Sequence, residues 1–280
     1  MKKQHKYAVL YAVLYAVVIS VLLICAWRSR NYIEHFSTSN LKLNDVKIFY
    51  INLDKNIARN NTFLNSYNNC DMKDLTIKRF PAILGKNVDF QEWLSPDALD
   101  QLKRTEATKT RTHHYHLTAG GVGCFLSHYN LAKQLLADND ANYYVVFEDD
   151  INFLPNTFKG INHYFPNVPG DWDILLLSSL RKINYIKVGD FYKPNGFWGT
   201  QSYIINKKGA QKLVKEVEKN KIDGQIDAYL SKMNQQKKIN IYITDKNLVY
   251  INELSETTDI QCRLIPMVGE NPFNYKGYIV

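Results

Sequence analysis

An apolar run near the start of the chain predicts a membrane segment. Residues 7–27 contain no charged side chain and read YAVLYAVLYAVVISVLLICAW. A run of about 20 apolar residues is long enough to cross a bilayer as a helix. The run is too long for a typical signal-peptide core and too apolar on every face for an ordinary core helix. We therefore predict a tail at 1–6, a transmembrane signal-anchor at 7–27, a stem at 28–44 and a domain over 45–280.

Beyond residue 44, short apolar runs alternate with segments of helical spacing. This alternation predicts an α/β domain with a mostly parallel sheet and late antiparallel additions. Asp54, Ser95 and Thr118 are predicted helix N-caps, and residues 103–117 are predicted to form a loop. Buried strands are predicted at Val46–Leu53, Tyr143–Phe147 and Trp172–Ser179, long helices from Ser95 and from Thr118 to about Ala137, and a hairpin over 185–198.

The charge pattern bears on orientation and on partners. Basic residues flank the apolar run, with three before it and two after it, which favours a cytoplasmic N-terminus and a domain in a lumen or periplasm, as in a type II membrane protein. The net charge is +8, and residues 1–30 hold five basic residues and no acids, which leaves +3 for residues 31–280. This mild balance gives no support to nucleic acid binding.

The cysteines predict no metal or disulfide framework. Cys25 lies in the apolar run, and Cys70, Cys124 and Cys262 are far apart. A cluster of His113, His114 and His116 lacks further zinc ligands nearby, so we interpret it as part of a mobile loop over a binding site.

In the stretch NYYVVFEDD, a predicted buried strand is followed directly by three acids, Glu148, Asp149 and Asp150. Adjacent carboxylates repel one another unless a positive charge holds them, and Mg²⁺ and Mn²⁺ prefer such oxygen ligands. In an extended chain Glu148 and Asp150 point to one side and Asp149 to the other, so the pair Glu148 and Asp150 is the predicted metal site. The alternative is a solvated strand end. Two Asp-x-Asp strings with the same spacing of acids, at 138–140 and 171–173, are expected to be solvated or to serve a turn.

Two further segments favour an anionic ligand. The segment Thr118–His128 begins a helix with three glycines, among them Gly120, and a helix N-terminus attracts a diphosphate. The alternative is that these glycines serve packing alone. Asn52 and Asp54 end another strand, with Arg59 one turn into the next helix, and ligands of α/β sheets bind outside the carboxyl ends of strands.

Seven blocks, in order, resemble glycosyltransferase family 25, the group of bacterial lipooligosaccharide galactosyltransferases and collagen-type galactosyltransferases. The blocks are IFYINLDKNIAR, RFPAILGK, LTAGGVGCFLSHYNLAKQLL, YYVVFEDDI, WDILLLSS, GTQSYIINKKGAQKLV and IDAYL. They cover about Lys47 to Leu230. The resemblance implies a GT-A-like (Rossmann-like) fold, a nucleotide-sugar donor, a divalent metal, Mn²⁺ or Mg²⁺, and inversion at the anomeric carbon.

The resemblance also implies roles for single residues. Asp227 matches an aspartate of the family and is the candidate general base, the alternative being a helix-cap acid. Trp198 is expected either to stack on a sugar or to belong to the core. The implied metal ligands are Glu148 and Asp150, and the implied donor contacts are Asn52, Asp54, Arg59, Gly120, Ser127, His128, Gly199 and Thr200.

The predicted function is transfer of a hexose, galactose or glucose, from a UDP-sugar to a glycan or glycosylated protein. A first alternative is an inactive, membrane-tethered binding or assembly module with the same fold. A second is a metal-dependent phosphohydrolase, which usually needs a second cluster of ligands that this sequence does not show.

Overall fold

The computed structural model describes residues 19–20, 46–252 and 263–264. The chain divides into two units, residues 1–39 and 40–280, and all elements named below belong to the second. Apart from Ile19 and Ser20, the predicted membrane segment at 7–27 lies outside the described residues. Among the residues that are described, no helix is both long enough and apolar enough to cross a membrane.

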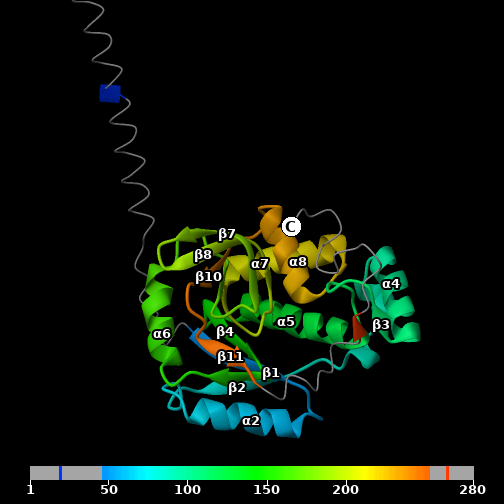
Figure 1. Ribbon diagram of the computed structural model, residues 1–280, viewed down its shortest axis with the longest axis horizontal. Coiled ribbons are helices and arrows are strands. Elements are labelled where there is room, and N and C mark those ends of the chain that lie inside the picture. The colour runs from blue at the N-terminus through cyan, green and yellow to red at the C-terminus, as the bar shows by residue number, and fades with distance from the viewer. Residues whose placement is uncertain (1–18, 21–45, 253–262, 265–280) are drawn as a thin grey trace, which may run out of the picture. The chain divides into compact units, whose positions relative to one another are not determined.

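The centre of the domain is an eight-stranded sheet in the order β2-β1-β4-β9-β6-β10-β8-β7 (Figure 1). Four of its seven strand pairings are antiparallel, so the predicted mostly parallel sheet is a mixed one. The antiparallel β9 separates β4 from β6 and is the main departure from the prediction. The strands are β1 (Val46–Asn52), β2 (Ile77–Pro81), β4 (Tyr143–Glu148), β6 (Ile174–Leu176), β7 (Arg181–Val188), β8 (Phe191–Trp198), β9 (Ser202–Asn206) and β10 (Ile241–Thr244).

Helices cover both faces of this sheet. One face packs against α4 (Pro96–Thr108), α5 (Ala119–Ala137), α7 (Lys207–Asn220) and α8 (Ile226–Gln235), and the other against α2 (Ile57–Asn68) and α6 (Thr157–Tyr164). Along β1, Phe49 and Ile51 face the first core, whereas Ile48 and Tyr50 face the second. A strand that is buried on both faces needs apolar residues at every position, which explains the unbroken apolar runs.

Smaller elements complete the described chain. The short strand β5 follows the acids and pairs with β11, and β3 pairs with β12. Their bounds are η2 (Gly85–Asn87), α3 (Phe90–Trp93), β3 (Thr110–Arg111), β5 (Ile151–Phe153), η3 (Phe165–Asn167), β11 (Val249–Ile251) and β12 (Arg263–Leu264).

The helix starts test the predicted caps. Ser95 and Thr118 are confirmed as N-caps, because their side chains accept hydrogen bonds from the backbone N–H groups of Ala98 and Gly121. Asp54 is not a cap, since α2 begins only at Ile57. The predicted loop at 103–117 is also wrong in its first part, because α4 continues to residue 108; its polar sequence is that of a largely exposed helix.

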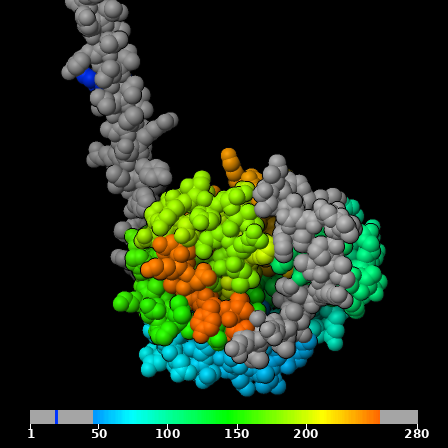
Figure 2. All heavy atoms as spheres, in the orientation of Figure 1, coloured from blue at the N-terminus to red at the C-terminus, as the bar shows by residue number. Residues whose placement is uncertain are grey.

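The predicted hairpin is confirmed as β7 and β8, which form the outer edge of the sheet. Gly189 lies at its tip with a φ of +59°, a backbone conformation that glycine adopts without strain. The hairpin is the yellow-green surface of Figure 2, and Tyr185 and Ile186 are among its exposed side chains.

Candidate active site

A cavity of about 310 Å³ opens at the carboxyl ends of the three parallel strands β2, β1 and β4. Each strand contributes the residues that follow it, because parallel strands present their carboxyl ends at one edge of a sheet. Asn52 and Arg59 come from the β1 side, residues 82–86 follow β2, Glu148 ends β4 and Asp149 follows it. The cavity also receives four cationic side chains: Lys55, Arg59, Lys86 and Lys109.

The N-terminus of α5 forms another wall of this cavity, through Thr118, Ala119 and Gly120. Gly123, one turn further on, has a packing role: a Cβ there would lie 2.3 Å from the carbonyl oxygen of Ile83. Gly120 thus lines the cavity and Gly123 lets the loop after β2 approach the helix, so packing does not account for all of these glycines, and an anion at the helix start stays a prediction.

The three acids are arranged differently from the prediction. Strand β4 ends at Glu148, and Asp149 and Asp150 belong to a turn, so the alternation of an extended chain no longer applies to them. Arg59 Nη2 lies 2.6 Å from Asp149 Oδ1 and 3.2 Å from Asp150 Oδ2. Asp149, which was expected to point away, lines the cavity and accepts a hydrogen bond of 2.6 Å from Asn52.

Negative charge exceeds positive charge around these acids. Among the described residues, Asp150 Oδ1 is buried without a hydrogen-bond partner. Burial and the charges of Glu148 and Asp149 raise the pKa of Asp150 to about 7, although Arg59 lowers it. An orphaned carboxylate oxygen in a negative environment fits a divalent cation with oxygen ligands.

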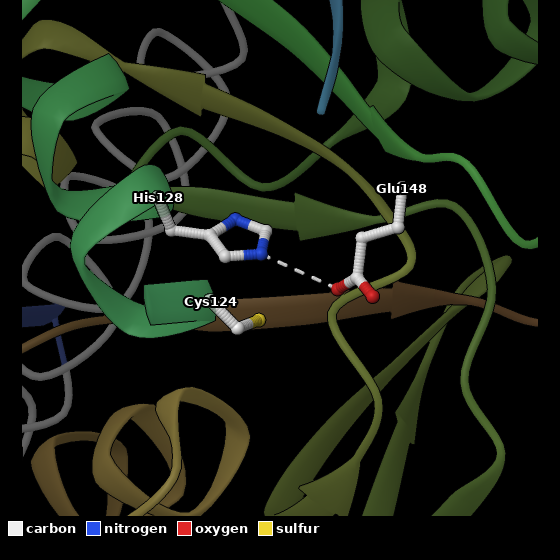
Figure 3. Close-up of side chains that lie close together, drawn as sticks. All are labelled: Cys124, His128 and Glu148. Atoms are coloured by element: carbon white, nitrogen blue, oxygen red, sulfur yellow. Dashed lines mark ion pairs between the residues drawn. The ribbon is translucent and has the colours of Figure 1, made fainter. Parts of the chain in front are cut away.

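Two side chains from other parts of the chain hold Glu148. His128 of α5 places Nε2 at 3.3 Å from Glu148 Oε1 (Figure 3). The Thr200 hydroxyl donates to the same oxygen at 2.9 Å. Burial alone would raise the pKa of Glu148, but His128, Thr200 and the charge of Arg59 bring it below its ordinary value. Glu148 is therefore a carboxylate at neutral pH. The ring of His128 is fixed on its other side, where Nδ1 lies 2.9 Å from the hydroxyl of Tyr203 on β9.

Asp227 lies in the first turn of α8 and is buried. Its oxygens accept hydrogen bonds from the N–H groups of Gly199, at 3.1 Å, and Ala228, at 2.7 Å. His114 Nε2 lies 3.8 Å from the same carboxylate. Burial raises the pKa of Asp227, but His114 and the two N–H groups outweigh burial and lower it, so that Asp227 is ionised at neutral pH. Asp227 also lies close enough to Cys124 for its charge to raise the pKa of that thiol, although burial raises it most.

The turn at Gly199 and Thr200 connects these acids. Gly199 has a φ of +90° and donates to Asp227, and the next residue, Thr200, donates to Glu148. Trp198 precedes them, and its ring stacks against His114 with the centroids 4.8 Å apart and an interplanar angle of 26°.

Of the eleven predicted site residues, five line the cavity and six do not. The Ser127 hydroxyl is fully buried, where it donates to the Gly123 carbonyl and accepts from the Ile83 N–H, and so joins α5 to the loop after β2. Asp54 is largely exposed and pairs with Arg79 at 2.6 Å. Gly199 and Thr200 hold the acids and, like Asp150 and Asp227, do not line the cavity. The predicted site residues that do line it are Asn52, Arg59, Gly120, His128 and Glu148.

Arg79 and Cys124 are site residues that the sequence analysis did not single out. Arg79 donates to the side chain and the carbonyl of Asn52, and so organises the chain after β1. Its signal was a basic residue within an otherwise strand-like run. Cys124 lies four residues before His128, a spacing that places both on one face of a helix.

His113 and His116 do not line the cavity. Their ring centroids lie 4.8 Å apart. Burial lowers the pKa of His116 to about 4, and the charges of His113, Arg104 and Arg111 lower it further.

Comparison with known protein families matches the part of the chain that contains these residues. The family model described as "Glycosyltransferase family 25 (LPS biosynthesis protein)" matches residues 45–230, more than half of the chain. The chain belongs to glycosyltransferase family 25. This confirms the predicted family and enzyme class.

Family 25 relatives match over part of their length. A "Glycosyltransferase 25 family member" of Aedes aegypti is 29% identical over 178 residues, which are 60% of this chain and 28% of that protein. Human "Procollagen galactosyltransferase 2" is 33% identical over 110 residues, 35% of this chain and 17% of the relative. The "Putative glycosyltransferase R655" of Acanthamoeba polyphaga mimivirus is 29% identical over 108 residues, 34% of this chain and 33% of the relative. Each match spans about a third of the relative or less.

Proposed function

We propose that this family 25 protein transfers a hexose, galactose or glucose, from a UDP-sugar to a hydroxyl of a glycan or glycosylated protein, with inversion at the anomeric carbon. The observation that carries the proposal is the cavity at the ends of β2, β1 and β4, where a helix N-terminus, four cationic side chains and three carboxylates surround one space. The proposed domain type is GT-A-like. The relatives named as galactosyltransferases support the choice of sugar.

The donor diphosphate would lie against the start of α5. Backbone N–H groups at a helix N-terminus favour an anion, and Lys55, Lys86 and Lys109 add positive charge from other walls. Asn52 and Arg59 would contact the nucleotide from the β1 side. The position of Asn52 is fixed by Arg79 and Asp149, so the polar wall is organised before a ligand arrives.

Mn²⁺ or Mg²⁺ would be held by Glu148 and Asp150. The orphaned Asp150 oxygen and the raised pKa of Asp150 fit such an ion. When bound, the cation would stabilise negative charge on the leaving diphosphate. Arg59, which contacts both Asp149 and Asp150, would keep these two carboxylates in place.

Asp227 would accept the proton of the acceptor hydroxyl. It is ionised, and two backbone N–H groups fix both of its oxygens. A positioned carboxylate of this kind contributes typically 10²- to 10⁴-fold to a reaction rate. The Gly199–Thr200 turn would keep the base and the metal ligand Glu148 at a fixed separation.

The chain is further proposed to be a single-pass type II membrane protein, anchored by residues 7–27, with its domain in a lumen or periplasm. The support is the uncharged run in the sequence and the basic residues before it. Full-length protein should remain in the membrane fraction after a high-salt wash, whereas protein that lacks residues 1–30 should be released. Retention of the shortened protein would contradict the proposal.

The experiment that tests the transferase proposal is a screen of UDP-sugars with the full-length protein and Mn²⁺. An active enzyme should hydrolyse at least one of them slowly, and chelation of the metal should stop the reaction. Failure to bind or hydrolyse any UDP-sugar would favour the alternative of an inactive, membrane-tethered binding module. Hydrolysis of simple phosphate esters without sugar transfer would favour a phosphohydrolase.

A further inference from the structure

Cys124, His128 and Glu148 form a cluster on one side of the cavity that the proposed reaction does not fully use (Figure 3). Cys124 and His128 are one helical turn apart on α5, and Glu148 ends β4. One ligand atom from each lies within 4.8 Å of the others. Cys124 and His128 also line the cavity together with Glu148.

The contact between His128 and Glu148 has the geometry of two ligands. Nε2 lies 3.3 Å from Oε1, yet within the described part of the chain this buried nitrogen has no hydrogen-bond partner. Two ligand atoms that each lie about 2.0–2.1 Å from a tetrahedral zinc ion are separated by roughly 3.3 Å. The two atoms therefore need no rearrangement to share an ion.

Neighbouring groups orient both of these ligands. The Tyr203 hydroxyl contacts Nδ1 of His128 at 2.9 Å, which leaves Nε2 as the nitrogen that faces Glu148. Thr200 donates to Glu148 at 2.9 Å. Metal-binding histidines and carboxylates are usually fixed in this way by a second hydrogen bond, which selects the tautomer and the orientation of the ligand.

The sulfur atom of Cys124 favours one class of metal ion over another. A sulfur ligand lies about 2.3 Å from zinc, and so roughly 3.5 Å from a nitrogen ligand of the same ion. Cys124 Sγ lies no more than 4.8 Å from the other two ligand atoms, so a shift of roughly 1 Å would complete the set. A thiolate and a carboxylate together balance a doubly charged ion. Thiolate and imidazole favour zinc over magnesium or manganese.

We propose that Cys124, His128 and Glu148 bind a thiophilic divalent cation such as Zn²⁺, with three protein ligands and a fourth position open to the cavity. This site is different in chemistry from the proposed oxygen site at Glu148 and Asp150, and it goes beyond the proposed transfer reaction. A three-ligand zinc site with an open position is the arrangement that can also take a small ligand.

The test uses full-length protein that has been treated with a chelator and then titrated with Co²⁺ under anaerobic conditions. Wild type should bind one equivalent, with a sulfur-to-cobalt charge-transfer band in the near ultraviolet and visible bands of a four-coordinate ion. Zn²⁺ should abolish these bands, and excess Mg²⁺ should not. Because the readout is spectroscopic, the test reports metal binding whether or not the protein has the proposed transferase activity.

Matched variants make the assignment specific. Cys124→Ser should lose the charge-transfer band, whereas Cys70→Ser should keep it, since Cys70 is a buried cysteine that contacts the carbonyl of Tyr67. Tyr203→Phe should weaken Co²⁺ binding by about 10- to 100-fold, the usual effect of removing a group that orients a ligand. Circular dichroism should show that each variant is folded.

Two results would overturn the proposal. One is wild-type protein that shows no sulfur-to-cobalt band. The other is a folded Cys124→Ser variant that keeps the band and the affinity of wild type, which would place the ion elsewhere and leave His128 and Glu148 as a simple structural contact.

Discussion

Two runs of acids border strands of the same sheet, and their charges are balanced in different ways. In the run at 171–173, Asp173 is fully buried before β6, with Lys212 as its close partner and Lys208 at 4.0 Å. It also accepts a hydrogen bond from the Asn240 N–H at 2.7 Å. The other acid, Asp171, is half exposed and lies 3.5 Å from Lys193.

The run at 148–150 has less compensation. One guanidinium, that of Arg59, contacts two of its three carboxylates. Asp150 Oδ1 and Asp173 Oδ1 both lack a hydrogen-bond partner among the described residues, but Asp173 faces two lysines, whereas the three acids at 148–150 share one guanidinium. The comparison shows why the Asp-x-Asp pattern alone is a weak predictor of a metal site. Acids that are matched by their own lysines hold a fold together, whereas acids in excess of their cations can receive an ion.

Asp227 is a third kind of buried acid, because backbone N–H groups rather than lysines contact its oxygens. Asp227→Asn should reduce transfer by about 10²- to 10⁴-fold, because an amide cannot accept the proton. Donor and metal affinity should persist. Asn retains only one of the two acceptor oxygens, so a loss of about 1 kcal/mol in the free energy of unfolding is expected in any case.

The measurement is the transfer rate with a matched acceptor, alongside donor binding by calorimetry. A transfer rate equal to that of wild type would remove Asp227 from the catalytic residues and leave it as a helix-start acid that fixes Gly199.

The uncompensated acids should matter for activity and little for stability. Glu148→Gln and Asp150→Asn each remove one anionic ligand while keeping the shape of the side chain. Transfer should fall by about 10²- to 10³-fold, the usual effect of losing one electrostatic contact to a transition state. The melting temperature of Asp150→Asn should stay constant or rise, because repulsion among the three acids is relieved. That of Glu148→Gln should fall slightly, because the fold holds the pKa of Glu148 below its ordinary value and so favours its charged form. Metal-dependent transfer that is unchanged in both variants would refute the role of these acids.

The compensated acid should behave in the opposite way. Asp173→Asn removes the partner of Lys212 and should lower the free energy of unfolding by about 1–3 kcal/mol, as measured by urea denaturation. Transfer at 25 °C should stay near the wild-type rate, because Asp173 precedes β6 and so lies at the edge of the sheet opposite to the end of β4, where the acids at 148–150 lie. A stable Asp173→Asn protein with a large loss of transfer would break the distinction between the two runs.

The smallest expected effect is on the pH dependence of stability and comes from Asp138, another acid that is paired with a lysine. Asp138, at the end of α5, lies 2.7 Å from both Lys47 Nζ and the Tyr144 hydroxyl. Burial raises the pKa of Asp138, but Lys47, Tyr144 and the Asp140 N–H outweigh it, and the folded-state pKa falls below the unfolded value of about 3.9. Its stabilising effect is thus present above that value and is lost as the pH falls through the folded pKa.

In thermal melts between pH 5 and 2, wild type should therefore lose stability more steeply than Asp138→Asn. Parallel pH profiles for the two proteins would show that the ion pair with Lys47 does not survive in solution.

The positions of strands and helices could largely be predicted from the sequence, because burial on both faces of β1 and β4 requires unbroken apolar runs, and because Ser95 and Thr118 are strong caps. The place of β9 between β4 and β6 could not, since strand order depends on contacts between distant segments. The end of α4 was missed because a largely exposed helix of polar residues has no apolar period.

The sequence predicted which residues belong to the site better than it predicted the contacts that they make. Strand ends indicated Asn52, Arg59 and Glu148, and the resemblance to the family indicated His128. Parallel strands bring the strand-end residues to one edge of the sheet. The direction of Asp149 was predicted wrongly, because strand alternation stops where the turn begins. Asp138 and Asp173 were expected to be solvated or to serve a turn, yet both are held by lysines from other elements, which no local pattern can indicate.

The central claim is that the acids at 148–150 carry uncompensated charge that receives a divalent cation. Its most direct test is Mn²⁺ binding to the full-length protein, followed by electron paramagnetic resonance of the free ion. We predict saturable binding of Mn²⁺ by wild type and by Asp173→Asn, and binding weakened at least about tenfold in Asp150→Asn, which corresponds to about 1.4 kcal/mol. Equal Mn²⁺ affinity in wild type and Asp150→Asn, or no binding by wild type, would contradict the account.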